Sequence, residues 1–246
     1  MIESIEKLKK EFERIRKEGY VPFNGKGSRA VGTLFERLIG KEDDELPIPD
    51  YEGIEIKTKY VDGEHREVGL FCCAPDGYID SLKDLINTYG YPDHIDPTLK
   101  AFNCIFNAKD IRRVGNYFFK INVDKKDKKV ILEIYNRQGI IIDNTVSWTF
   151  DILKEYIERK LQYLAFIEAD RYWNGSQVYF WYNKITFYKL TSFERFIELF
   201  DNGHIVVKIL LQTVRDGNKK GKIHNSGPSF AIDDFEHLNL LFDKIE

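Results

Sequence analysis

The sequence predicts a mixed α/β protein with a large antiparallel component, and three observations support this fold class. Apolar residues recur at helical spacing in several segments, and segments with alternating apolar residues lie between them. Some of the alternating segments are separated only by short polar turns, which is typical of antiparallel strands. The chain has 246 residues, 43% hydrophobic and 31% charged, which excludes a disordered protein and fits one large domain or two lobes.

The individual elements follow from these two periodicities. Apolar residues of the first helix repeat from Ile2 to Ile15 and stop at Gly19, and those of the second face one way from Val31 to Leu38 before Gly40. In chain order we expect helices over 2–18 and 31–39, strands over 53–60 and 66–74 joined by a turn at 61–65, a helix over 78–89, strands over 103–107, 116–123, 129–135 and 140–142, a helix over 149–162, strands over 163–172 and 177–184, a helix over 192–200, strands over 205–215 and 230–232, and a last helix over 234–242.

The overall charge and the cysteines narrow the class of protein. The net charge is −3, so global basicity does not indicate nucleic acid, although binding needs only a locally positive face. No uninterrupted apolar stretch approaches the roughly 18 residues of a membrane span, and the charged N-terminus is not a secretion signal. The three cysteines include the adjacent pair Cys72 and Cys73, which suits reduced thiols. We therefore expect a cytoplasmic protein with no membrane partner.

The stretch 47–60, PIPDYEGIEIKTKY, places charged residues in a strand-like segment. Side chains alternate across a strand, so Ile54 and Ile56 share one face while Glu55 and Lys57 share the other. The isoleucines can anchor the strand in the core. The acid and the lysine can then line a functional site on the opposite face.

Asp50 precedes this strand, where the turn at Pro49 can bring its carboxylate toward Glu55. Two carboxylates this close repel one another unless a cation lies between them, and hard oxygen ligands suit Mg²⁺. A bound Mg²⁺ lowers the pKa of its water and offsets charge on a phosphoryl group, while Lys57 can orient or deprotonate the attacking water. The pattern predicts a metal-dependent site for phosphodiester hydrolysis.

A simpler interpretation is an edge strand that carries a solvated ion pair. The acid-x-Lys pattern recurs elsewhere in the chain, at Asp124-Lys125-Lys126, Asp127-Lys128-Lys129 and Glu158-Arg159-Lys160. Only the copy at Glu55 lies on an alternating strand with an aspartate upstream. Glu36, on the preceding helix, could bring a further carboxylate to the same metal, or it could be a solvated residue paired with Arg37 or Lys41.

The segment from His204 to His224 carries a local excess of positive charge, with five Lys or Arg against one Asp. Lys219, Lys220 and Lys222 alternate with glycines at what we expect to be a hairpin tip, and Arg215 lies at its base. Such a tip can follow DNA phosphates, or it can simply be a solvated turn.

Three separated segments resemble one known family. The segments KGSRAVGTLFERLIG…PDYEGIEIKTKY, VILEIYNRQGIIIDNTVSWTFDILKEYIERKLQYLAFIEA and GKIHNSGPSFAI are similar to the MutH/MvaI-type (MvaI/BcnI-like) type II restriction endonucleases, a branch of the PD-(D/E)xK nucleases. The resemblance spans almost the whole chain. Asp50, Glu55 and Lys57 match the catalytic motif of the family, Glu36 matches an additional helix carboxylate, and His224 matches a histidine that contacts DNA.

The resemblance implies a restriction-endonuclease-like (MutH-like) mixed sheet flanked by helices, with two lobes around a DNA cleft. The catalytic lobe would span 1–160 and the DNA-recognition lobe 161–246. The implied activity is a monomeric, Mg²⁺-dependent, sequence-specific hydrolase that cuts double-stranded DNA one strand at a time. Asp50, Glu55 and Glu36 would hold the metal, and Arg215, Lys219, Lys220, Lys222 and His224 would contact DNA. A restriction role implies a cognate DNA methyltransferase as genetic partner.

The recognition sequence is not implied, because the chain departs from the family at positions that contact bases. The relatives have an acidic residue and an arginine where this chain has Lys208 and Leu210, an arginine at Ala231 and, in some members, a histidine at Ser226. Arginine is the usual bidentate reader of guanine. Two other functions stay open: a MutH-like mismatch-repair nicking endonuclease that needs an activator, and a catalytically silent DNA-binding module.

Overall fold

The structure is a computed structural model that describes all residues except 26–29, 42–47, 61–65, 79, 226 and 246. The expected turn at 61–65 lies within these gaps, and Ser226 is also outside the described residues. The described chain contains six α-helices and two short 3₁₀ turns, which are α1 (Ile2–Lys17), α2 (Ala30–Leu38), α3 (Ser81–Tyr89), α4 (Phe150–Lys160), α5 (Phe193–Asp201), η1 (Gly217–Lys219), η2 (Phe235–His237) and α6 (Leu238–Leu241).

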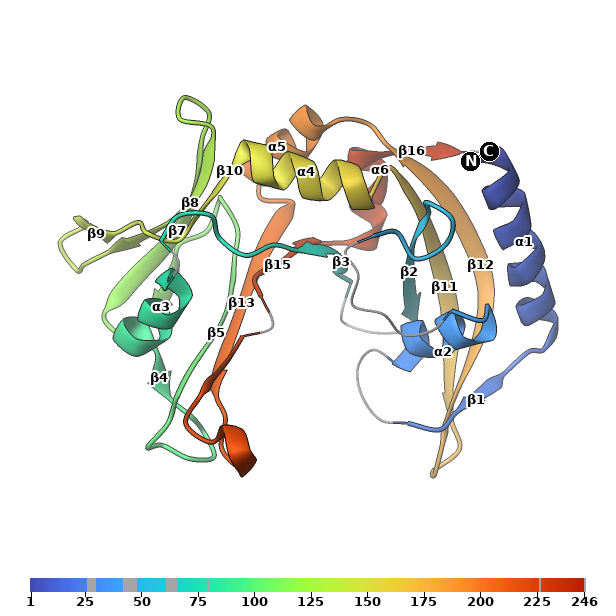
Figure 1. Ribbon diagram of the computed structural model, residues 1–246, viewed down its shortest axis with the longest axis horizontal. Coiled ribbons are helices and arrows are strands. Elements are labelled where there is room, and N and C mark those ends of the chain that lie inside the picture. The colour runs from blue at the N-terminus through green and yellow to red at the C-terminus, as the bar shows by residue number, and fades with distance from the viewer. Residues whose placement is uncertain (26–29, 42–47, 61–65, 79, 226, 246) are drawn as a thin grey trace. The chain divides into compact units, whose positions relative to one another are not determined.

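The strands form three sheets and confirm the mixed α/β class (Figure 1). In chain order they are β1 (Val21–Phe23), β2 (Glu55–Tyr60), β3 (Val68–Cys72), β4 (Tyr91–Pro92), β5 (Lys100–Phe106), β6 (Arg112–Val114), β7 (Tyr117–Asp124), β8 (Lys129–Tyr135), β9 (Ile141–Asp143), β10 (Ser147–Thr149), β11 (Tyr163–Trp173), β12 (Val178–Leu190), β13 (Ile205–Thr213), β14 (Ile223–Asn225), β15 (Ser229–Ile232) and β16 (Phe242–Ile245).

The chain divides into two compact units, and each is built from separate segments. Unit 1 comprises residues 1–68, 157–192 and 234–246, and unit 2 comprises 69–156 and 193–233. These units do not follow the expected boundary at residue 160, because the sheet of unit 1 draws strands from both sides of it. Local sequence periodicity carries no signal for such long-range pairing.

Unit 1 is a sheet with the strand order β1-β12-β11-β2, with β16 added to β12. The long hairpin β11–β12 forms its centre, and β2 lies parallel to β11 at one end. Helix α1 lies beside β12, and α2 packs against β2 (Figure 1). Their apolar faces and one face of the sheet form a core that includes Leu8, Phe12, Phe35, Ile56 and Tyr182. Burying side chains of this size supplies most of the driving force for folding.

Unit 2 contains two sheets and the helices α3 and α5. The first has the order β3-β15-β13-β5-β4 with β14 added to β13, and the second has the order β10-β8-β7-β6 with β9 added to β8. On β5 and β13, alternate residues such as Phe102, Cys104, Ile209 and Leu211 are buried. The opposite face carries Ile105 and Leu210, which are about half exposed.

Two sequence expectations about elements are wrong. Strand β3 pairs with β15 and strand β2 pairs with β11, so the described strands do not form the expected pair of β2 with β3. The expected last helix is a 3₁₀ turn followed by the four residues of α6, and the chain continues as β16. Residues Phe242–Ile245 pair with the end of β12, so Phe242, the last residue of the expected helix, belongs to a strand instead.

Candidate active site

Strand β2 and the turn before it carry the predicted residues Asp50, Glu55 and Lys57, which we call the β2 cluster. Ile54 and Ile56 are buried in the core of unit 1, which confirms the expected alternation. Glu55 and Lys57 lie on the other face, next to Leu164 and Phe166 of β11. The side chain of Glu55 is only 1% exposed and that of Lys57 is 24% exposed. The strand therefore holds this carboxylate buried instead of displaying it to water.

Two lysines face the buried carboxylate of Glu55. Lys57 donates a hydrogen bond to Oε1 at 2.6 Å, and the Nζ of Lys160, at the end of α4, lies 3.3 Å from the same oxygen. Burial raises the pKa of Glu55 above its usual range, and the charge of Lys57 opposes this shift. The second oxygen, Oε2, is buried and has no hydrogen-bond partner among the described atoms. A buried carboxylate oxygen that has no partner lowers the stability of the fold unless a cation or a hydrogen-bond donor binds it.

Asp50 reaches β2 through a tight turn. Tyr51 and Ile54 pair across this turn, and the intervening Glu52 and Gly53 have positive φ angles of 41° and 88°. The chain thereby reverses, and Oδ2 of Asp50 accepts a hydrogen bond from the N–H of Ile56 at 2.9 Å.

The environment of Asp50 keeps its carboxylate ionised. Burial favours the neutral acid, but the ammonium of Lys41, which donates to Oδ1, and the Ile56 N–H together hold the pKa of Asp50 below its usual range. The charge of Asp50 in turn helps to raise the pKa of Glu55. The two carboxylates are thus electrostatically coupled, as the sequence predicts.

Glu36 lies on the helix that packs against the other face of β2. A Cβ built on Gly32 would lie 4.0 Å from Oε1 of Glu36 and 3.1 Å from Oγ1 of Thr58, so this carboxylate lies near Thr58. Its charge also contributes to the raised pKa of Tyr182, after burial. The ligand atoms of Glu36, Asp50 and Glu55, all of them described residues, do not lie within 4.8 Å of one another. Its role as a metal ligand therefore stays a prediction.

The donor set around β2 fits a divalent cation. Asp50 and Glu55 supply carboxylate oxygens, which hard cations prefer, and Oε2 of Glu55 is available for a further bond. The ammonium of Lys41 faces Oδ1 of Asp50, and those of Lys57 and Lys160 face Oε1 of Glu55. This arrangement can hold a cation and present an ammonium beside it.

The predicted DNA-contacting residues lie in unit 2. Lys219, Lys220, Lys222 and His224 are exposed, on a turn that begins with η1 and ends in β14. The guanidinium of Arg215, in contrast, makes a bidentate ion pair with a carboxylate that the sequence analysis did not single out, that of Asp93.

The positions at which this chain departs from the resembled family lie in the same sheet. Lys208 and Leu210 share one face of β13, and the side chain of Leu210 is 45% exposed. Ala231, by contrast, is buried in β15 opposite Val206. The small side chain of alanine fits this buried position, whereas an arginine would require the neighbouring side chains to rearrange.

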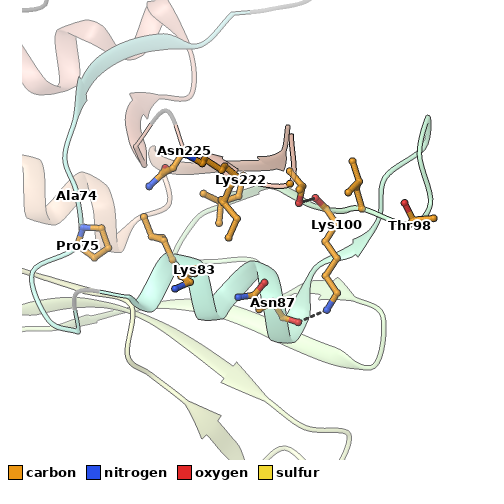
Figure 2. Close-up of a pocket in the computed structure, with 14 residues that line it drawn as sticks. Ala74, Pro75, Lys83, Asn87, Thr98, Lys100, Lys222 and Asn225 are labelled. Atoms are coloured by element: carbon orange, nitrogen blue, oxygen red, sulfur yellow. Dashed lines mark hydrogen bonds between the residues drawn. The ribbon is translucent and has the colours of Figure 1, made fainter. Parts of the chain in front are cut away.

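A cavity of about 840 Å³ also lies in unit 2, beside α3 and the turn that carries Lys222. Figure 2 shows Lys83, Lys100 and Lys222 among its lining residues, with Lys100 hydrogen-bonded to the carbonyl of Asn87. None of the predicted catalytic residues lines it. It is therefore distinct from the candidate active site on β2.

The chain matches the model of a known protein family over nearly its whole length. Residues 9–242 match the model of the MvaI/BcnI restriction endonuclease family. The chain belongs to the MvaI/BcnI restriction endonuclease family. It is accordingly a type II restriction endonuclease, a site-specific deoxyribonuclease. Restriction endonucleases generally use a divalent metal ion, in agreement with the donor set on β2.

Solved structures support the same assignment. The chain is similar to a structure described as "Restriction endonuclease MvaI-cognate DNA substrate complex", with a TM-score of 0.90 and 30% identity over 100% of this chain and 98% of that one. A structure of "Restriction endonuclease MvaI in the absence of DNA" matches with a TM-score of 0.63 and 29% identity over the same shares. The expected restriction-endonuclease-like fold is thereby confirmed. No curated protein matches the chain, and no helix in the described residues is long and apolar enough to cross a membrane.

Sequence reasoning missed two lysines of this endonuclease's candidate site. Lys160 belongs to one of the acid-x-Lys copies that the sequence analysis set aside, because the copy lies on a helix. The lysine at the end of this helix reaches Glu55. Lys41 was considered only as a partner of Glu36, whereas its ammonium contacts Asp50. Both contacts join segments that are distant in the sequence or separated by an undescribed run.

Proposed function

We propose that this restriction endonuclease hydrolyses phosphodiester bonds of double-stranded DNA with Mg²⁺ held by Asp50 and Glu55. The observation that carries the proposal is the carboxylate of Glu55. One of its oxygens accepts from Lys57, and the other is buried without a hydrogen-bond partner among the described atoms. A small hard cation is the ligand that such an oxygen prefers.

The residues of β2 divide the chemistry among them. When bound, Mg²⁺ would supply a water of lowered pKa and offset the negative charge that develops on the phosphoryl group. Asp50 is kept ionised and oriented by the Ile56 N–H. Lys57, anchored 2.6 Å from Oε1 of Glu55, can donate a hydrogen bond to the attacking water and to a phosphate oxygen. Lys160 adds a second positive charge against Glu55.

Glu36 would act from the neighbouring helix. The resemblance implies that its carboxylate holds a water of the metal or a second cation. In the structure this carboxylate lies near Thr58, which strand alternation places on the face of β2 opposite Glu55 and Lys57.

The DNA would be contacted by unit 2 and cut by unit 1. The similar MvaI structure is described as a complex with its cognate DNA, and the exposed lysines 219, 220 and 222 with His224 form a basic surface suited to phosphates. Unit 1, which holds the β2 cluster, would thus be the catalytic lobe, and unit 2 the recognition lobe.

The biological setting follows from the reaction. An endonuclease that cuts unmodified DNA would destroy the DNA of its own cell, so we propose a cognate methyltransferase that protects the recognition sequence. As the resemblance implies, the enzyme would act in the cytoplasm as a monomer.

The decisive experiment is digestion of a phage genome by the purified protein with Mg²⁺, followed by sequencing of the fragment ends. We expect fragments with one shared sequence at their ends, and no fragments when Ca²⁺ replaces Mg²⁺ or when Asp50→Asn is used. Asp243→Asn, an exposed residue of β16, is the matched control and should cut normally. Cutting by Asp50→Asn at the normal rate would contradict the proposal, and binding without any cutting by the unaltered protein would favour a silent DNA-binding module.

A further inference from the structure

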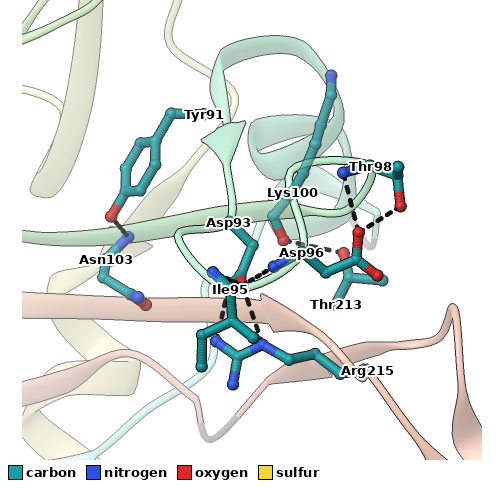
Figure 3. A network of polar contacts seen from close by, with 9 residues as sticks. All are labelled: Tyr91, Asp93, Ile95, Asp96, Thr98, Lys100, Asn103, Thr213 and Arg215. Carbon is teal, nitrogen blue, oxygen red and sulfur yellow. Dashed lines mark hydrogen bonds and ion pairs between the residues drawn. The ribbon is translucent and has the colours of Figure 1, made fainter.

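Arg215, which follows β13, is held by the buried carboxylate of Asp93 (Figure 3). Its Nε donates to Oδ1 of Asp93 at 2.9 Å and its Nη2 donates to Oδ2 at 2.7 Å. This is the parallel two-bond geometry in which arginine and carboxylate bind most strongly. The side chain of Asp93 is only 2% exposed, whereas that of Arg215 is 30% exposed. The carboxylate of Asp93 is therefore removed from water, while part of the Arg215 side chain remains exposed.

Asp93 also organises the loop that contains it. Its Oδ1 accepts from the N–H groups of Ile95 and Asp96 at 2.9 and 3.1 Å, and its own N–H donates to the carbonyl of Leu99. Asp96 in turn accepts from the N–H and the hydroxyl of Thr98 (Figure 3). Residues 93–99, which we call the anchor loop, are thus closed by their own hydrogen bonds and give Arg215 a rigid partner.

The basic turn, residues 217–222, begins two residues after Arg215. Val214 closes its base, since the N–H of Val214 donates to the carbonyl of Lys222 at 2.8 Å and its carbonyl accepts from Gly221 at 2.9 Å. One residue before, the hydroxyl of Thr213 donates to the carbonyl of Lys100, just beyond the anchor loop. Fixing the guanidinium of Arg215 therefore fixes the base of the turn against the anchor loop.

We propose that Arg215 is a positioning residue: with Asp93 it holds the basic turn on the anchor loop so that Lys219, Lys220 and Lys222 are presented to DNA, and it does not itself neutralise a phosphate. The proposal rests on the proposed function, because it takes the basic turn as a DNA-contacting surface. It replaces the expectation that Arg215 contacts DNA directly.

The charges of this region support that division of roles. The carboxylate of Asp93 offsets the charge of Arg215. The hydrogen bond from Arg215 in turn holds the pKa of Asp93 far below its usual range. Hydrogen bonds from Thr98, helped by the charge of Lys220, lower the pKa of Asp96, so the anchor loop also attracts the turn electrostatically. The lysines of the turn remain exposed and keep the net positive charge that phosphate binding requires.

Two variants separate positioning from direct contact. Arg215→Lys keeps the charge but loses the fork that matches Asp93, and Asp93→Asn removes the negative charge that holds Arg215. Binding to a random-sequence duplex would be measured in Ca²⁺ over a series of salt concentrations, with the full-length protein at a temperature where thermal unfolding shows every variant folded. If Arg215 positions the turn, each variant weakens binding roughly tenfold, and the double variant is no weaker than either single one.

The opposite results overturn the proposal. If Arg215 contacts a phosphate, Arg215→Lys binds within about twofold of the unaltered protein, because lysine also pairs with phosphate, and Asp93→Asn binds more tightly because it releases the guanidinium. Lys125 and Asp201, an exposed ion pair of the same unit, provide the matched control. Lys125→Ala and Asp201→Asn should leave binding unchanged.

A third arm distinguishes failure of this inference from failure of the proposed function. Lys220→Ala and Lys222→Ala should each lower the slope of log affinity against log salt by about 0.9. If they do not, the basic turn does not contact DNA, and the DNA-binding surface of the proposed function falls together with the role of Arg215. If they do, but Arg215→Lys behaves like the unaltered protein, only the positioning role is wrong.

Discussion

Glu55 combines two properties that seldom coexist in one carboxylate. It is almost fully buried, which favours the neutral acid, yet two ammonium groups lie within 3.3 Å of one of its oxygens. Breaking a buried charged pair by removing one partner is costly because the other charge then lacks compensation. The lysines therefore favour the ionised form of Glu55, which the proposed Mg²⁺ site requires, in a setting that would otherwise neutralise it.

The two lysines should differ in their effect on cleavage. Lys57→Met removes the nearer ammonium, which can also reach the attacking water, so cleavage of phage DNA should fall by about 100-fold or more while binding in Ca²⁺ persists. Lys160→Met removes only a charge that supports Glu55, and its loss should be smaller, roughly tenfold.

Single-turnover rates in Mg²⁺ measure this difference, with Lys244→Met, exposed on β16, as the control for loss of one positive charge in unit 1. Equal losses for Lys57→Met and Lys160→Met would show that Lys57 acts only through Glu55.

Asp93 should make the stability of the protein depend on pH. Arg215 and the loop N–H groups lower its pKa in the folded protein, so its contribution is present above the unfolded value of about 3.9 and is lost as the pH falls below it. The Tm of the unaltered protein should therefore fall more between pH 5 and pH 3 than the Tm of Asp93→Asn. Calorimetry at the two pH values checks this, and equal falls would show that Asp93 is not coupled to folding.

At the scale of elements, the turn at 51–54 determines where Asp50 lies. Gly53 has a φ of +88°, where a side chain is strained, and a Cβ there would also meet Met1 at 3.3 Å. Gly53→Ala should lower the free energy of unfolding by about 1–2 kcal/mol and also reduce cleavage, because the turn that orients Asp50 is distorted.

Gly19→Ala is the matched control for this turn. Gly19 has a φ of +72° and open space around it at the end of α1, so alanine there should cost similar stability without loss of cleavage. Chemical denaturation and cleavage rates measure both effects. A Gly53→Ala enzyme that cuts normally would show that the turn does not set the position of Asp50.

Helices and strands could be predicted from the sequence better than the pairing between strands. The helix of Ile5, Leu8, Phe12 and Ile15 and the strand around Glu55 were predictable, because each periodicity reports the burial of its own face. The partner of β3 was not, since a nearby strand was the simpler choice and β15 lies far along the chain.

At the site, the cluster on β2 was predictable from three residue types at fixed spacing. Lys160 and Asp93 were not, because each acts on a residue more than 100 positions away.

At the scale of the whole molecule, each compact unit carries a different part of the proposed reaction. The carboxylates and lysines of β2 lie in unit 1, and the basic turn with its anchor loop lies in unit 2. Because both units are assembled from separate segments, neither corresponds to one continuous stretch of sequence. Truncation near residue 160 would remove β11 and β12 from the sheet that holds β2, so it would not yield an independent catalytic domain.

The proposed monomer has a consequence for the course of cleavage. One chain carries one cluster of Asp50, Glu55 and Lys57, and one such cluster hydrolyses one phosphodiester bond at a time. The two strands of a duplex run in opposite directions, so cutting the second strand requires a second binding event in the reverse orientation. A supercoiled plasmid with a single recognition site should therefore pass through an open-circular intermediate before it becomes linear.

Gel electrophoresis of a time course, with plasmid in excess over enzyme, measures this intermediate. Its rate of formation should be first order in enzyme, and the free enzyme should sediment as a monomer. Direct linearisation with a second-order dependence on enzyme would contradict the monomer. It would mean that two chains, each supplying one β2 cluster, cut the two strands together.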